Sequence, residues 1–363
     1  MRGYAAVALL SLAFSQPVAG QLEVAELGSC PLELGGRVEE CRLAYQTYGR
    51  LNAAGSNAIL IPTWFTGRAA AWESMLGPDG AVDTTSHYVV VVESLGAGAS
   101  SSPVTSSVQP GLAFPEITIG DMVVASYRLA TEHLGLDSLD AVVGVSMGAM
   151  QAFEWAVRYP EYVGRIVPIA GAPRQAPFQR AIWQLIADAA HEGASAGDPG
   201  DEVIDELAHL ILLVLTSPEA VNTGDYAQQV AQQAEALRAA ELLEWAWHAR
   251  AILRFDVGRA HGGSLESATA SWNRPTLIVV SEQDHSVSPE PALEFGRLVG
   301  AEVLVLPDPA GHLAFFSNAE AQAAVRRFLA GPDSPDAPVP DEAVKRNDAW
   351  RMLALQMDRL GGR

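Results

Sequence analysis

Short apolar runs alternate with stretches of helical periodicity over most of the chain. The runs that predict buried strands are 57–62, 87–92, 139–145, 165–170, 275–281 and 302–306. Between most of them, apolar residues recur at the spacing of amphipathic helices. Strands that are apolar on both faces are typical of a parallel sheet covered by helices on each side. The pattern therefore predicts an α/β fold with a mostly parallel sheet.

The stretch 173–272 breaks this alternation, because helical segments follow one another there without a convincing strand. These segments are 178–190, 202–215 and 226–255. We expect the stretch to form a helical cap inserted into a sheet domain made of residues 21–172 and 273–331. Residues 332–363 contain a Pro/Asp linker and a terminal helix of unassigned purpose.

Residues 1–20 have the layout of a secretory signal peptide. A single charge at Arg2 precedes an apolar stretch at 5–14, and small residues lead to a cleavage point near Gly20. The stretch is too short to span a bilayer, and no other segment is long enough to do so. We expect a secreted or periplasmic protein without a membrane anchor in its mature form. The alternative is a buried N-terminal helix.

The two cysteines fit an oxidising compartment. Cys30 and Cys41 flank Gly35-Gly36, and a two-residue hairpin turn at these glycines would place the cysteines directly opposite each other. Opposite positions on neighbouring strands are close enough for a disulfide. We predict a Cys30–Cys41 disulfide, and two unpaired small apolar residues are the alternative.

The overall charge limits the partners. The 363-residue chain has a formal net charge of −20, whereas nucleic acids and anionic membranes are bound by basic surfaces. We expect neither as a partner. No cluster of His and Cys has metal-ligand spacing, so we expect no metal and no other cofactor.

A Gly-x-Ser-x-Gly motif, Gly144-Val145-Ser146-Met147-Gly148, joins a predicted strand to a predicted helix. In this context the motif is typical of a nucleophile elbow, in which a serine lies on a sharp, strained turn. The glycines have no Cβ atom, so the strand and the helix can pack closely around the serine. Ser146 is therefore the candidate nucleophile.

The candidate acid and base lie further along the chain. A serine hydroxyl needs a histidine to take its proton and a carboxylate to orient that histidine. In α/β hydrolases the acid and then the histidine come after the serine, each behind a sheet strand. Asp284 and His312 follow the strands 275–281 and 302–306 in this order. We predict a triad of Ser146, Asp284 and His312.

Neighbouring residues offer alternatives. Glu282 lies on the loop of Asp284 and is a second candidate acid, whereas Asp308 is expected to shape the turn before His312. His285 is a bystander or a substrate contact. The other histidines have no catalytic context and are expected at ordinary helix or loop positions: His87, His133, His191, His209, His248 and His261.

An acyl-serine mechanism also needs hydrogen-bond donors for the oxyanion. In this fold they are the backbone N–H groups of the residue after the nucleophile, here Met147, and of a residue in the loop after the third strand. Trp64 and Phe65 are the candidates in that loop. Their side chains either help to exclude water or serve only in packing.

Three stretches resemble homoserine O-acetyltransferases of the α/β-hydrolase superfamily. They are residues 44–52 (AYQTYGRLN), 114–123 (FPEITIGDMV) and 146–155 (SMGAMQAFEW). The resemblance extends over about residues 32–329 and implies an α/β-hydrolase fold with a helical lid. It further implies the same triad, an oxyanion hole made by the amides of Phe65 and Met147, and acetyl transfer from acetyl-CoA through an acyl-serine. A homodimer formed through the cap is also consistent with it.

The chain departs from this family where homoserine is bound. The family has an aspartate directly after the catalytic histidine, which binds the homoserine amino group, and this chain has Leu313 there. Thr63 stands in place of a histidine, and Ala149 in place of a glycine. Arg180 is a candidate for the lid arginine that grips the homoserine carboxylate. The resemblance thus implies acyl-transfer chemistry without homoserine recognition.

Taken together, the sequence predicts an exported serine hydrolase that cleaves a small carboxylic ester with water as the acceptor. Trp64 and Leu313 are expected substrate contacts, and Leu313 suits an uncharged group. The alternative is an O-acyltransferase with an acceptor alcohol other than homoserine; a catalytically inactive binding protein is a third hypothesis. The cap tryptophans line an apolar pocket or belong to the cap core: Trp183, Trp245 and Trp247.

Overall fold

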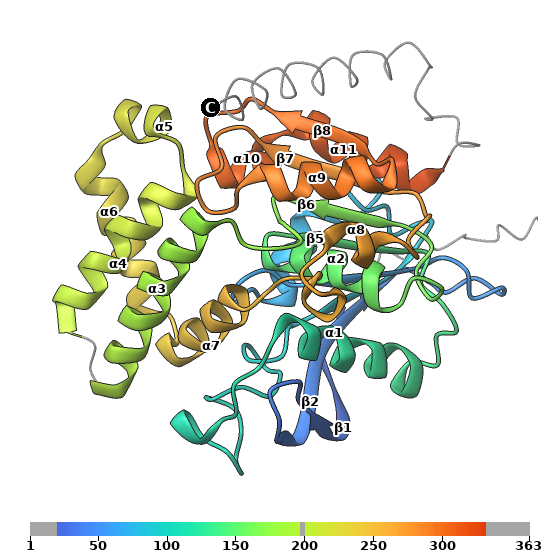
Figure 1. Ribbon diagram of the computed structural model, residues 1–363, viewed down its shortest axis with the longest axis horizontal. Helices are drawn as coiled ribbons and strands as arrows, with labels where there is room; N and C mark the ends of the chain where they lie inside the picture. Colours follow the sequence, from blue (N-terminus) through green and yellow to red (C-terminus); the bar gives the residue numbers. More distant parts are fainter. Residues whose placement is uncertain (1–19, 197–199, 332–363) are drawn as a thin grey trace, which may run out of the picture.

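An eight-stranded sheet forms the centre of the computed structural model, which describes residues 20–196 and 200–331 (Figure 1). The strands are β1 (Glu23–Pro31), β2 (Arg37–Tyr48), β3 (Ala58–Pro62), β4 (Tyr88–Val92), β5 (Ala141–Val145), β6 (Ile166–Ile169), β7 (Leu277–Ser281) and β8 (Glu302–Leu306). They lie in the order β1-β2-β4-β3-β5-β6-β7-β8, and β3 to β8 run parallel. The prediction of a mostly parallel sheet is confirmed, and the carboxyl ends of its parallel strands meet at one edge.

Helices cover both faces of the sheet. Successive side chains of a strand point to opposite faces, and apolar side chains on both faces have to be buried. In β3, Leu60 packs into one hydrophobic core, whereas Ile59 and Ile61 pack into the other. The first core holds α1 (Ile119–Arg128), α2 (Met147–Arg158), α8 (Leu265–Thr269) and α9 (Pro289–Val299). The second holds η1 (Ala69–Met75), α10 (Ala314–Ser317) and α11 (Ala319–Ala330). The shorter turns are η2 (Gly111–Ala113), η3 (Leu129–His133), η4 (Arg259–His261) and η5 (Gly311–Leu313).

Five consecutive helices between β6 and β7 form a separate lobe beside the sheet (Figure 1). They are α3 (Pro177–Ala196), α4 (Gly200–Leu215), α5 (Pro218–Thr223), α6 (Tyr226–Arg238) and α7 (Leu242–Leu253). We call these helices the cap. The sequence predicted one helix over 226–255, but the chain turns at 239–241. The break was not predicted because no glycine or proline marks it in the sequence and the apolar periodicity continues across it.

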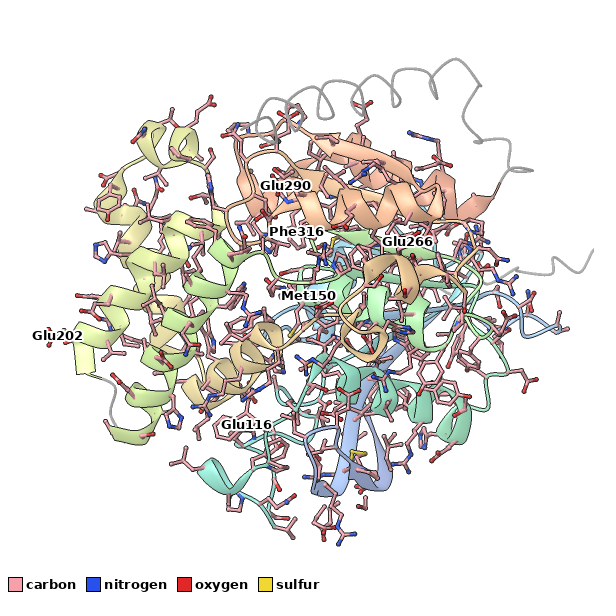
Figure 2. The ribbon with its side chains drawn as sticks, in the orientation of Figure 1. Glu116, Met150, Glu202, Glu266, Glu290 and Phe316 are labelled. Carbon is pink, nitrogen blue, oxygen red and sulfur yellow. A yellow bond between two sulfur atoms is a disulfide. The ribbon has the colours of Figure 1, made fainter. Side chains whose placement is uncertain are left out.

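The Cys30–Cys41 disulfide joins β1 to β2, with the two Cα atoms 5.7 Å apart (Figure 2). The disulfide prediction is confirmed, but the predicted register is wrong. Cys30 faces Val38, and Cys41 faces Gly28. The turn is longer than two residues, since the N–H of Leu32 donates to the carbonyl of Gly36, and the ladder is irregular around Gly28. The disulfide therefore joins two residues that are not direct partners in the ladder.

Two predicted segments lie wholly or almost wholly outside the described residues: the signal peptide at 1–20 and the C-terminal stretch at 332–363. Among the residues that the structure describes, none of the helices combines the length and apolar character needed to cross a bilayer.

Candidate active site

Ser146 lies on a strained turn between β5 and α2. Its φ of +57° falls in the left-handed region, where a residue with a side chain is rare. A Cβ atom on Gly144 would lie 2.1 Å from the carbonyl oxygen of Gly148, and one on Gly148 would lie 2.4 Å from that of Pro62. Both glycines are therefore required by close backbone packing, as the motif predicted.

The structure brings Ser146, Asp284 and His312 together. The Nε2 atom of His312 lies 2.9 Å from Ser146 Oγ, and its Nδ1 atom lies 2.7 Å from Asp284 Oδ2. The other oxygen of Asp284 accepts hydrogen bonds from the backbone N–H groups of Ser286 and Val287. All three predicted residues are buried. This carboxylate is thus fixed on both oxygens, and it holds the imidazole in the tautomer that can accept the serine proton.

The alternative residues lie elsewhere. Glu282 is exposed and makes no hydrogen bond to His312, whose Nδ1 is held by Asp284. The Oδ1 atom of Asp308 accepts from the N–H of Ala310 at 2.7 Å, so this residue shapes the turn as expected. His285 offers its backbone carbonyl to Gln179 at 3.4 Å.

Backbone N–H groups of α2 and of the loop after β3 remain available for an oxyanion. Met147 is the first residue of α2, a position where the N–H has no partner within the helix. The N–H groups of Trp64 and Phe65 likewise donate to no other group within the described chain. The dipole of α2 also favours negative charge at this end. They include the amides of Phe65 and Met147, the two donors that the resemblance implies.

A cavity of about 330 Å³ opens beside Ser146 and His312. The core side contributes Trp64, Phe65, Leu313 and Phe316, and the cap contributes Trp183, Ile211, Val214, Leu215, Gln233 and Trp245. The ring of Phe65 packs against those of Trp183 and Trp245, with centroids 5.1 and 4.9 Å apart. Among its described lining residues, His312 is the only one with an ionisable side chain. The cavity therefore suits an uncharged, mostly apolar ligand.

Not every predicted contact reaches this cavity. Trp64 and Leu313 line it, and Leu313 is 37% exposed. Arg180 is exposed on α3 and lies outside the lining of the cavity. Trp247 is buried and donates its indole N–H to the carbonyl of Pro115 at 2.8 Å, which makes it a packing residue. Thr63 is buried and exchanges hydrogen bonds with Ser94.

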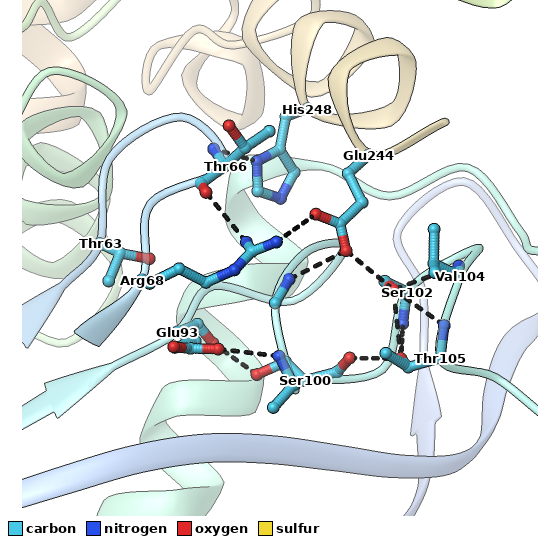
Figure 3. Close-up of polar contacts among 12 residues, drawn as sticks. Thr63, Thr66, Arg68, Glu93, Ser100, Ser102, Val104, Thr105, Glu244 and His248 are labelled. Carbon is cyan, nitrogen blue, oxygen red and sulfur yellow. Dashed lines mark hydrogen bonds and ion pairs between the residues drawn. The ribbon is translucent and has the colours of Figure 1, made fainter. Parts of the chain in front are cut away.

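Sequence reasoning missed two polar residues of α7 that contact the loops after β3 and β4 (Figure 3). Glu244 and His248 are both buried. Burial lowers the pKa of His248 to about 4 and raises that of Glu244. The available signal was their spacing: two polar residues one turn apart on a helix that is otherwise mostly apolar.

No group of three or more metal-ligating side chains occurs in the described ranges.

A family model described as the alpha/beta hydrolase fold matches residues 57–319. A probable esterase of Corynebacterium glutamicum is 34% identical over 334 residues, covering 85% of this chain and 94% of its own. An ethyl acetate hydrolase of Pseudomonas veronii is 32% identical over 324 residues, covering 82% and 91%. A homoserine O-acetyltransferase of Chlorobaculum parvum is 30% identical over 318 residues, covering 80% and 89%. The resemblance to acetyltransferases is thus confirmed.

Two solved structures are also similar. An acetylester hydrolase from Corynebacterium glutamicum superposes with a TM-score of 0.79 at 30% identity, covering 85% of this chain and 95% of that one. The acetyl esterase MekB superposes with a TM-score of 0.80 at 30% identity, covering 86% and 98%. The similarity spans both the sheet and the cap.

Proposed function

Because the chain belongs to the α/β-hydrolase fold family and is an enzyme of the kind that its esterase and hydrolase relatives represent, we propose that it hydrolyses short-chain carboxylic esters through an acyl-serine. The observation that carries this proposal is the hydrogen-bonded chain from Ser146 through His312 to Asp284. Ser146 and His312 line a mostly apolar cavity.

In the acylation step, Ser146 Oγ attacks the ester carbonyl carbon while His312 Nε2 takes the hydroxyl proton. The negative charge that develops on the carbonyl oxygen is stabilised by the N–H groups of Phe65 and Met147. The tetrahedral intermediate then breaks its bond to the alcohol oxygen. His312 returns the proton to this oxygen, and the alcohol is released. The acyl group stays bound to Ser146 Oγ as an ester.

In the deacylation step, a water molecule takes the place of the alcohol. His312 accepts one of its protons as the water oxygen attacks the acyl-serine carbonyl, and the same N–H groups stabilise the second oxyanion. Collapse of this intermediate returns the proton to Ser146 Oγ and releases the carboxylic acid. Asp284 keeps its charge throughout and stabilises the imidazolium that forms in each step.

The cavity supports a small, uncharged substrate. Its volume of about 330 Å³ lies near the lower end of ligand pockets. Leu313 follows His312 directly and borders the cavity, so an apolar group of the ester lies beside it. A substrate ammonium or carboxylate would lose its hydration here without gaining a partner.

A panel of acetate, propionate and butyrate esters tests the proposal with purified protein. Wild type hydrolyses the short esters, whereas Ser146→Ala loses about 10⁶-fold in kcat and no longer reacts with a fluorophosphonate probe. Wild-type protein that turns over none of these esters and is not labelled at Ser146 would overturn the proposal.

Leu313→Asp tests the substrate class. A carboxylate beside His312 has to be partly desolvated when an apolar ester binds, so we expect kcat/KM for that ester to fall about 10-fold. Leu313→Met, which keeps the apolar volume, serves as the control and stays within about twofold. Equal turnover of the apolar ester by wild type and Leu313→Asp would refute the predicted contact.

A second candidate function is acyl transfer to an alcohol other than homoserine. It is favoured by the similarity to a homoserine O-acetyltransferase of Chlorobaculum parvum. The two functions differ only in what attacks the acyl-serine. Adding candidate alcohols to the ester panel separates them: transfer that outpaces hydrolysis supports the transferase, and an unchanged yield of acid supports the hydrolase.

We also propose that the protein is exported. The disulfide between Cys30 and Cys41 supports an oxidising compartment, where such bonds persist. N-terminal sequencing of protein recovered from the native host would find a start near Gln21. A retained Met1 in reduced, intracellular protein would contradict export.

A further inference from the structure

The loop after β3 carries one of the two proposed oxyanion donors, and the cap helix α7 holds it through a polar network (Figure 3). We call residues 63–68 the oxyanion loop. Thr66 in this loop has a φ of +49°, a left-handed conformation that a β-branched residue adopts at a cost. Such a conformation persists only where surrounding contacts hold it.

α7 holds one backbone group of Thr66 directly and the other through Arg68 of the same loop. Its N–H donates to Nδ1 of His248 at 3.1 Å, and its carbonyl accepts from Arg68 at 2.9 Å. Arg68 is in turn paired with Glu244 at 3.0 Å, one helical turn before His248. Glu244 also accepts from the N–H of Gly98 in the loop after β4. One face of α7 therefore ties the two loops together at the carboxyl edge of the sheet.

The hydrogen-bond partners of His248 define the protonation state and tautomer of its imidazole. Its Nε2 atom lies 3.0 Å from the carbonyl oxygen of Leu95, which can only accept a hydrogen bond. Its Nδ1 atom faces the N–H of Thr66, which can only donate. These contacts select the neutral imidazole with the proton on Nε2. The side chain is fully buried, so its ring has little room to reorient.

The N–H of Phe65 lies between restrained groups. On its C-terminal side His248 holds the N–H of Thr66, and the N–H of Gly67 donates back to the carbonyl of Trp64 at 2.9 Å. The Phe65 ring is packed among Trp183, Trp245 and His248 of the cap. The direction of this N–H thus depends on contacts that the cap provides.

We propose that His248 is a positioning residue, which acts through Thr66 to hold the Phe65 N–H where the oxyanion develops. The inference rests on the proposed function, since it concerns the same acyl transfer to Ser146. On this proposal the cap both lines the cavity and helps to position a donor of the oxyanion hole. Arg68 acts in the same way from the carbonyl side of Thr66.

Two variants of His248 test the proposal in the full-length protein. His248→Phe keeps a ring of similar size but removes both hydrogen bonds, and we expect kcat to fall about 10²-fold with KM within about threefold. His248→Asn restores an oxygen near the position of Nδ1, and we expect it to recover at least about 10-fold of the lost kcat.

Trp247→Phe is the matched control, because it removes a hydrogen bond between α7 and the core that does not involve the oxyanion loop. Its kcat should stay within about twofold of wild type. Arg68→Met is a second test in case His248→Phe does not fold. The Arg68 side chain is 46% exposed, and its loss should lower kcat about 10-fold at constant KM.

A boronic acid that forms a tetrahedral adduct with serine provides a readout that a merely structural role would not change. Its affinity should fall in each variant by the same factor as kcat. A loss of kcat without a loss of adduct affinity, or equal kcat in wild type, His248→Phe and Arg68→Met, would overturn the inference. Wild type that hydrolyses no ester would overturn the proposed function instead, so the two failures are distinguishable.

Discussion

The nucleophile elbow and the oxyanion loop line the same cavity, but they are held in place differently. Ser146 is fixed by its own neighbours in the chain, since Gly144 and Gly148 let β5, α2 and β3 approach closely. Thr66 also has a positive φ, yet the group that accepts its N–H is 182 residues away on α7. The nucleophile belongs to the core, whereas one half of the oxyanion hole depends on the cap.

This difference predicts how the two regions respond to change. A defect in the elbow displaces the nucleophile itself and strains the backbone of the core. A defect in the network around Thr66 leaves Ser146 in place and weakens only the stabilisation of the transition state. The first should therefore reduce both stability and activity, and the second mainly activity.

Among the changes that leave the triad side chains intact, Gly148→Ala should have the largest effect. The new Cβ would lie 2.4 Å from the carbonyl oxygen of Pro62, and a backbone group cannot move aside cheaply. We expect kcat to fall at least about 10²-fold and the free energy of unfolding to drop by about 2 kcal/mol. Urea denaturation and ester hydrolysis measure the two quantities.

Val157→Ala, in the last turn of the same helix, is the control for a change in α2 that does not touch the elbow. It should cost up to about 1 kcal/mol and leave kcat within about twofold. A Gly148→Ala protein with wild-type stability and turnover would remove the steric explanation of the elbow.

Glu244→Gln should have an intermediate effect. The carboxylate accepts hydrogen bonds from Arg68, Gly98 and Ser102, and a neutral amide has only one oxygen for these donors. We expect kcat to fall about 10-fold with little change in KM. Steady-state kinetics with a short-chain ester measure both.

Glu116→Gln is the matched control for Glu244→Gln. Glu116 is also a carboxylate that pairs with arginines of α7 and its end, Arg250 and Arg254, but on an exposed surface away from the oxyanion loop. Its kcat should match that of wild type. If both variants lost the same activity, the effect would come from the anchoring of α7 as a whole.

A further effect concerns the pH dependence of stability and not turnover. The pKa of His248 falls from 6.5 to about 4 on folding because the ring is buried. Below pH 6.5 His248 is therefore protonated in the unfolded chain, whereas in the folded protein it stays neutral down to about pH 4. The stabilisation is complete above the unfolded pKa and is lost as the pH falls, by about 3 kcal/mol in total.

Comparison with His248→Asn isolates this contribution, because the other titrating groups are shared. Between pH 7 and pH 4, wild type should lose about 3 kcal/mol more free energy of unfolding than the variant. Urea denaturation at intervals of pH provides the two curves. Parallel curves would show that His248 takes up its proton equally in the folded and unfolded states.

The sequence was most informative where function depends on neighbours in the chain. Ser146 lies between two glycines, and Asp284 and His312 each follow a buried strand, so the order of strands alone brought them together. The role of His248 was not predictable in this way. Its partners come from the loops after β3 and β4, and nothing in its local sequence shows that they converge on α7.

The disulfide shows the same limit at shorter range. The pair Cys30–Cys41 was predicted from a two-residue turn, but the longer turn and the irregular ladder at Gly28 shift the register. The bond still forms because a disulfide tolerates a range of Cα separations, which includes the observed 5.7 Å. Pairing could be predicted from the sequence, whereas register depended on backbone irregularities that the pattern does not show.

The most direct test of the account is to trap the acyl-enzyme. Wild-type protein is mixed with a short-chain activated ester, quenched in acid after a few milliseconds, digested and analysed by mass spectrometry. We predict one acyl group per chain, located on Ser146, that forms and decays at rates consistent with turnover. Ester hydrolysis that proceeds without an acyl group on Ser146, or with one on another residue, would contradict the account.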